Sequence, residues 1–122
     1  MSKENMNEDK VATVKLTDVD TGEVYVLDFS RESVKFAEAR GFKVNEISDF
    51  PATRIPEFFF YAFRKNHKRV ARSQTDDLLE KMGGVSTQLL ERLIQLYNQA
   101  ALTHLIVLDE DDEKNVTVTV EL

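Results

Sequence analysis

The sequence of 122 residues contains no cysteine, and this absence excludes several classes of protein at once. Disulfide scaffolds, thiolate zinc sites, iron–sulfur clusters and cysteine nucleophiles all require a thiol. Four glycines and two prolines leave little room for glycine-rich phosphate loops. No apolar run approaches the roughly 20 residues of a membrane span, and the opening MSKENMNEDK lacks the apolar core of a signal peptide. We therefore expect a cytoplasmic protein without membrane contact.

Residues that could perform chemistry are also scarce. The two histidines, His67 and His104, lie far apart, and no H-x-x-x-H or H-E-x-x-H spacing exists. Ser30 and Ser86 have the positions of helix caps rather than of nucleophiles. The stretch Asp18–Glu23 weakly resembles a calcium loop, but its glycine is the fifth residue and strand-like runs flank it, which favours a hairpin turn. We expect no catalytic residues, no metal site and no cofactor, and therefore not an enzyme.

Charge is unevenly distributed along the chain. Hydrophobic residues make up 42%, enough for one small domain, and 22 acidic against 16 basic side chains give a net charge of −6. Between Arg54 and Arg72 the net charge is +5, which leaves −11 for the rest. Two interpretations of this basic cluster remain open: a solvated helix end where cations suit the helix dipole, or a site for a protein partner with an acidic surface.

A third interpretation of the basic cluster is binding to nucleic acid. Basic and aromatic side chains together can bind single strands, and two predicted helices joined by Gly83-Gly84-Val85 have the length of a helix-turn-helix. However, the second of these helices starts Thr87-Gln-Leu-Leu-Glu-Arg, with one basic residue among six, and the whole chain is acidic. The sequence therefore argues against nucleic acid as the partner.

The first half of the chain predicts a β-hairpin followed by a helix. The runs Val11–Thr17 and Val24–Phe29 have strand-like patterns and flank Asp20-Thr21-Gly22, a turn signal. Ser30 is placed to cap a helix over Arg31–Arg40, and Gly41 to end it. A connector over Val44–Pro56 follows, in which either proline fits the first turn of the next helix.

The second half predicts three helices. The first carries Phe58, Phe59, Phe60, Tyr61 and Phe63, too many aromatics for one stripe, so it is either buried on several sides or exposed to another chain. Thr75 is placed to cap the second helix, which ends at Gly83. Ser86 is placed to cap the third helix, over Thr87–Val107. Together with the hairpin these helices predict an α+β fold, a hairpin packed on about four helices.

The two ends of the chain are set apart by composition. Residues 1–10 are polar and we expect them to be a flexible tail, with the single α+β domain over 11–108. The acidic run Asp109–Glu113 is expected to form a solvated hinge. Asn115–Leu122 alternates strictly and predicts a strand if it finds a sheet edge, either on the hairpin or on a neighbouring chain.

Several of these passages together resemble a known family. They are Leu27-Asp-Phe-Ser-Arg-Glu-Ser-Val-Lys-Phe-Ala-Glu-Ala-Arg-Gly-Phe42, the aromatic helix from Ile55 to His67, Gln74-Thr-Asp-Asp-Leu-Leu79 and the long leucine-rich helix. Over residues 11–106 the sequence is similar to tail assembly chaperones of tailed bacteriophages and prophages of Gram-positive hosts. The similarity lies in pattern and carries no catalytic signature.

The resemblance implies a non-enzymatic assembly factor that binds the tape-measure protein, recruits tail-tube subunits and is absent from the mature virion. It also implies self-association and, in many members, a frameshift-extended form. An exposed aromatic surface beside the basic cluster would suit such a client. The residues expected to contact the partner are Phe59, Phe60, Phe63, Arg64, Lys65, Lys68 and Arg69. Two alternatives remain: a structural or head–tail completion protein of the virion, and a small nucleic-acid-binding regulator that uses Arg64–Arg72.

Overall fold

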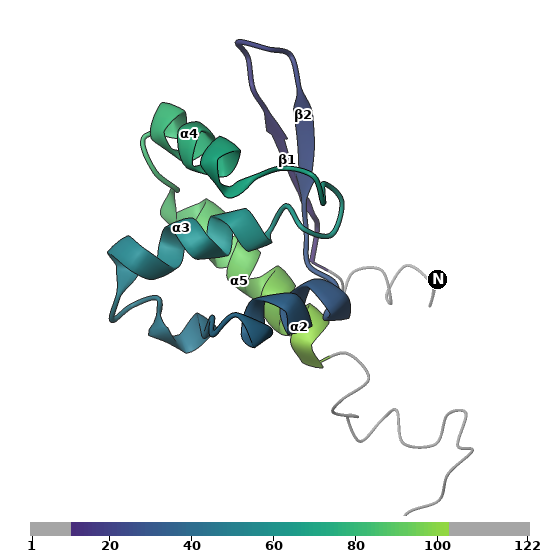
Figure 1. Ribbon diagram of the computed structural model, residues 1–122, viewed down its shortest axis with the longest axis vertical. Helices are drawn as coiled ribbons and strands as arrows, with labels where there is room; N and C mark the ends of the chain where they lie inside the picture. Colours follow the sequence, from purple (N-terminus) through teal and green to yellow (C-terminus); the bar gives the residue numbers. More distant parts are fainter. Residues whose placement is uncertain (1–10, 103–122) are drawn as a thin grey trace, which may run out of the picture.

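The computed structural model describes residues 11–102, and its elements follow the predicted α+β order (Figure 1). The elements are β1 (Val14–Thr17), β2 (Val24–Leu27), α2 (Arg31–Ala39), a short 3₁₀ turn η1 (Val44–Glu46), α3 (Pro51–Tyr61), α4 (Arg72–Met82) and α5 (Thr87–Leu102). Within residues 11–102, a two-stranded antiparallel hairpin followed by four α-helices confirms the predicted fold. The predicted N-terminal tail, acidic hinge and terminal strand lie outside the described residues.

The hairpin turn forms where the sequence predicts it. β1 and β2 pair antiparallel, with Val14 opposite Leu27 and Thr17 opposite Val24. Asp18 closes the turn, because its backbone N–H donates to the Glu23 carbonyl at 2.8 Å and its carboxylate accepts from the Asp20 N–H at 3.0 Å. Gly22 has a φ of 80°, a conformation that glycine adopts without steric cost.

Two serines hold the start of α2. The Ser30 hydroxyl accepts from the Ser33 N–H at 3.1 Å, and the Ser33 hydroxyl accepts from the Ser30 N–H at 2.8 Å. The helix ends at Ala39, one residue before the predicted Arg40, and the Phe42 N–H donates back to the Ala37 carbonyl at 3.1 Å. This return places the Phe42 ring in the core.

The aromatic run on α3 forms the centre of the core. Pro51 occupies the first turn, so the second half of the predicted connector is helical. The Phe58 ring stacks between those of Phe29 and Phe42, with centroids at 5.3 and 5.4 Å, and Tyr97 of α5 meets it edge-on at 5.6 Å. Of the two sequence-based interpretations, burial on several sides is therefore the one observed.

The start of α4 differs from the prediction. The helix begins at Arg72, and the predicted cap Thr75 lies fully buried inside it, with its hydroxyl donating to the Arg72 carbonyl at 2.9 Å. Gln74 provides the capping bond instead, because its side-chain oxygen accepts from the Ala71 N–H at 2.8 Å. The earlier start lets α4 pack against α3, and Gly83, with a φ of 74°, ends it as predicted.

The last described helix, α5, lies across the other elements. The Ser86 hydroxyl accepts from the Leu89 N–H at 3.0 Å, which confirms the predicted cap. Leu93, Leu96 and Tyr97 face the core, and the helix packs against both α2 and β1 (Figure 1). Its predicted continuation to Val107 lies outside the described residues. No helix within 11–102 is long and apolar enough to cross a membrane.

Candidate functional site

Two of the aromatic residues expected to contact a partner are part of the core. Phe59 and Phe63 are each 1% exposed, and their rings pack against each other at 5.1 Å, with Phe63 also against Tyr25 of β2 at 5.2 Å. The prediction that they form a partner surface is corrected by this burial, because both side chains belong to the hydrophobic core. Phe60 is half-buried and remains at the surface of α3.

The segment that follows α3 is fixed to the outer edge of β2. The Val26 N–H donates to Nε2 of His67 at 2.9 Å, and the Val26 carbonyl accepts from the Asn66 side-chain amide at 3.1 Å. The Asp28 N–H donates to the Ala62 carbonyl at 3.1 Å. Because these bonds anchor the segment, the cations that it carries project from a defined backbone. His67 is therefore a structural residue.

Lys65 is separated from the other cations by its ion pair. Its Nζ lies 2.6 Å from Oδ2 of Asp28, and the other carboxylate oxygen of Asp28 accepts from the Phe29 N–H at 2.7 Å. Asp28 is 9% exposed, so this buried carboxylate needs the cation as its partner. Lys65, predicted as a partner contact, thus stabilises the junction between β2 and the end of α3.

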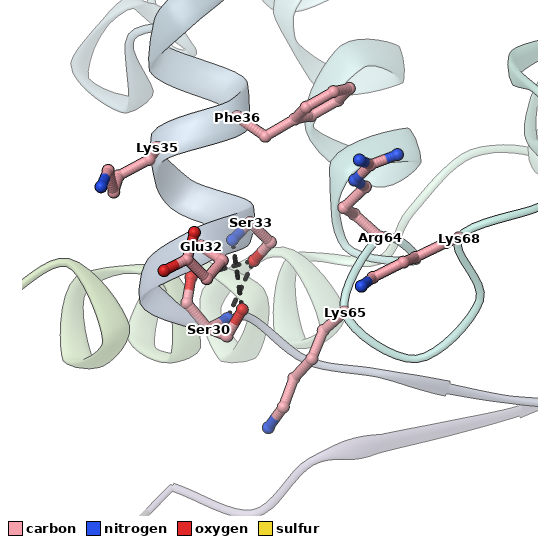
Figure 2. Close-up of a pocket in the computed structure, with 8 residues that line it drawn as sticks. All are labelled: Ser30, Glu32, Ser33, Lys35, Phe36, Arg64, Lys65 and Lys68. Atoms are coloured by element: carbon pink, nitrogen blue, oxygen red, sulfur yellow. Dashed lines mark hydrogen bonds between the residues drawn. The ribbon is translucent and has the colours of Figure 1, made fainter.

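A cleft rich in basic side chains lies between α2 and the end of α3 (Figure 2). This basic cleft has a volume of about 480 Å³ and is lined by Ser30, Glu32, Ser33, Lys35, Phe36, Arg64, Lys65 and Lys68. Figure 2 shows Lys68 pointing toward the amino end of α2, whereas Lys65 points away and Lys35 projects from the far side of the helix. Arg64 and Lys68 are therefore the cations that face the cleft.

Arg64 is held in place by an aromatic ring. Its guanidinium lies 3.9 Å from the centroid of Phe36, and the guanidinium of Arg40 lies over the same ring at 4.3 Å. Phe36 itself packs edge-on against Tyr61 of α3 at 6.0 Å. The ring orients the guanidinium and leaves its N–H donors free for a planar anion such as a carboxylate.

The charge in the basic cleft is uncompensated. Within residues 11–102, no carboxylate lies at ion-pair distance from Arg64 or Lys68. Glu32 is the one acidic residue that lines the cleft, and the positive end of the α2 dipole opposes its effect. The cleft can therefore bind a carboxylate or another anion.

Arg69 lies apart from this cleft, in a second hollow beside β2 that Lys68 also borders. The structure thus turns Arg64 and Lys68 toward the cleft, whereas the ammonium of Lys65 is paired with Asp28 and Arg69 lies in the second hollow. Sequence reasoning missed Phe36 and Arg40, although their spacing of four residues on a predicted helix indicates that they are neighbours. Within residues 11–102, no group of three or more acidic or histidine side chains is arranged to hold a metal ion.

Comparison with other proteins places the chain by family alone. Searches of curated proteins and of solved structures give no significant match. A family model described as a domain of unknown function (DUF5055) matches residues 1–122, the whole of the sequence. The chain belongs to the DUF5055 family.

Proposed function

We propose that this protein is a non-enzymatic binding protein, a tail assembly chaperone of a tailed phage or prophage, whose basic cleft holds an acidic segment of its client. The observation that carries the proposal is the pair of uncompensated cations, Arg64 and Lys68, in a cleft of about 480 Å³ beside the amino end of α2. The sequence resemblance adds the client class, the tape-measure and tail-tube proteins.

The geometry of the cleft suits a protein segment better than a small metabolite. Phe36 orients the Arg64 guanidinium, so an acidic side chain of an extended segment can place its carboxylate on the cation. The opposite charges of cleft and client would also speed their encounter, and this contribution falls with salt. Because Phe59 and Phe63 are buried, the proposal does not depend on the aromatic surface expected from the sequence.

The test is an affinity capture from phage-producing cells. The tagged protein is compared with the double variant Arg64→Glu/Lys68→Glu, and the co-eluting proteins are identified by mass spectrometry. We expect a tape-measure or tail-tube protein with the wild type and about a tenfold loss with the variant, the ratio that 1.4 kcal/mol produces. Lys65 is left intact, because its reversal would break the ion pair with Asp28.

A matched control separates the cleft from net charge. Lys15 and Lys43 are exposed and do not line the basic cleft, so Lys15→Glu/Lys43→Glu makes the same charge change elsewhere. Equal loss in both variants would contradict a role for the cleft. An eluate rich in nucleic acid and lost at moderate salt would favour the regulator instead. Presence of the protein in purified virions would favour the structural alternative.

A further inference from the structure

The basic cleft lies beside the carboxyl end of α5. A neighbouring hollow of about 460 Å³ is lined by Gln99 and Ala100 of α5 together with Ser30, Arg31 and Lys65. Ser30 and Lys65 also line the basic cleft, so the two hollows share a border. Figure 1 shows the end of α5 next to α2, in agreement with the contacts between these helices. The chain that leaves α5 therefore starts next to the cleft.

The sequence that follows carries the strongest acidic signal in the protein. Asp109–Glu113 is Asp-Glu-Asp-Asp-Glu, five consecutive carboxylates with no cation among them, and it begins nine residues after Ala100. Nine residues span about 30 Å when extended, at about 3.3 Å each, and about 13 Å when helical, at 1.5 Å each. Because the two hollows share Ser30 and Lys65, an extended connection of this length can carry the run from the end of α5 into the basic cleft.

We propose that the acidic run Asp109–Glu113 binds the basic cleft of the same chain and competes there with an acidic client. The run is chosen over residues 1–10 on charge, because Lys3 and Lys10 nearly neutralise Glu4, Glu8 and Asp9. Arg31 lines the neighbouring hollow and makes no ion pair within residues 11–102. The run would thus pass the unpaired cation Arg31 before it reaches Arg64 and Lys68 in the cleft.

Binding between the acidic run and the cleft is expected to be weak, because it depends on exposed ion pairs. An exposed ion pair contributes little, about 0.2–1 kcal/mol, but a short connection raises the effective concentration of the run to the millimolar range. The expected result is a cleft that is partly occupied and opens for a client of higher affinity. The competition rests on the proposed function, whereas the contact between run and cleft stands independently of it.

The contact is tested by NMR on the full-length protein. The variant Asp109→Asn/Glu110→Gln/Asp111→Asn/Asp112→Asn is compared with wild type, with the amides of Ser30, Ser33 and Lys68 as reporters of the cleft. We expect these amides to shift in the variant at low salt, and the difference to vanish in 0.5 M NaCl. Unchanged cleft amides at low salt overturn the proposal.

A control variant distinguishes the contact from a change in net charge. Asp49→Asn/Asp77→Asn/Glu80→Gln/Glu91→Gln removes four exposed carboxylates that do not line the cleft. Equal shifts in this control overturn the proposal, and so does a shift that survives after Arg64→Gln/Lys68→Gln removes the cleft cations. The control must leave the chemical shifts of the cleft amides at their wild-type values.

The competition is tested with a synthetic hexaglutamate peptide. We expect the variant with the neutralised run to bind this peptide about two- to tenfold more tightly than the wild type, the range that a millimolar effective concentration gives when the run has a Kd of about 0.1–1 mM for the cleft. Equal affinities overturn the competition. If no chain binds the peptide, yet the cleft amides still report the run, the client proposal fails and the self-contact holds, so the two failures are distinguishable.

Discussion

Nε2 of His67 accepts a hydrogen bond of 2.9 Å from the backbone N–H of Val26, 41 positions earlier in the sequence. Nε2 must be unprotonated to accept, so the ring carries its proton on Nδ1. The same ring lies edge-on against Tyr25 at 5.3 Å and Phe63 at 6.3 Å. One side chain thus joins the segment that carries the cleft cations to the hairpin and to the core.

Removal of this acceptor leaves the Val26 N–H without its partner. We expect His67→Ala to lower the free energy of unfolding by about 1–3 kcal/mol, the cost of an unsatisfied donor together with the lost ring contacts. Urea denaturation measures the change, and Arg69→Ala, an exposed neighbour, is the control, with an effect within about 0.5 kcal/mol. Equal stability of His67→Ala and wild type would show that the bond contributes nothing.

The cations after α3 are expected to fall into two classes according to how much their removal destabilises the protein. Lys65→Ala removes the partner of the buried Asp28 carboxylate, and we expect a loss of about 1–3 kcal/mol. Lys68→Ala should change stability by less than about 0.5 kcal/mol, because Lys68 is exposed and has no ion pair within residues 11–102. Thermal unfolding of both variants checks this difference. Similar losses for both would contradict the distinction between a structural and a binding cation.

The centre of the core is expected to be intolerant of truncation. Phe58 is fully buried between Phe29 and Phe42, so Phe58→Ala should cost about 3–5 kcal/mol through lost burial and the cavity that remains. Phe50 is 57% exposed, and the same substitution there should cost far less. The comparison is made by chemical denaturation, or by the fraction folded if Phe58→Ala does not fold. A small effect at Phe58 would contradict the packing described.

The hairpin tip should make stability depend on acid pH. A hydrogen bond from Lys81, at 2.9–3.0 Å, holds the pKa of Asp18 below its ordinary value. The stabilisation is therefore present above the ordinary pKa near 4 and is lost as the pH falls through the lowered pKa. We expect the melting temperature of wild type to exceed that of Asp18→Asn at pH 7, and the gap to close as the pH falls well below 4. A gap independent of pH would rule out this linkage.

Alkaline pH should act through the buried tyrosines. Burial raises the pKa of Tyr97 to about 12 and also raises that of Tyr61. Their neutral forms stabilise the fold below pH 10, and this stabilisation is lost as the pH rises from about 10 to 12. Absorbance at 295 nm should therefore show phenolate formation together with unfolding, and Tyr97→Phe should move the alkaline midpoint upward. Ionisation of all three tyrosines near pH 10 in a folded protein would disagree with their burial.

Local signals in the sequence were sufficient for most of the fold. The turn at Asp18–Glu23 and the caps Ser30 and Ser86 depend on residues within a few positions of each other, and all three are observed. The prediction for Thr75 is wrong because the local pattern of a hydroxyl before two acids does not reveal that this position is fully buried in α4. A residue in contact with another element cannot also be a solvated cap.

The candidate site was less predictable because its contacts are long-range. The basic composition of Arg64–Arg69 is visible in the sequence. The ion pair between Lys65 and Asp28 spans 37 positions, so only the fold shows that this lysine already has a partner. The sequence predicts that Phe59 and Phe63 contact a partner, because it does not show how many faces of α3 are buried. Composition thus indicated where charge gathers, and tertiary contacts decided which charges are available.

The hydrogen bonds that Val26 makes with Asn66 and His67 also affect where another chain can pair with the hairpin. An exposed strand edge is a template on which other chains can pair, the first step of many aggregates. Here the outward-facing backbone groups of Val26 are already occupied by two side chains, so β2 is closed to an added strand at this position. A strand that pairs with the hairpin at this position must therefore approach β1, so addition here is one-sided.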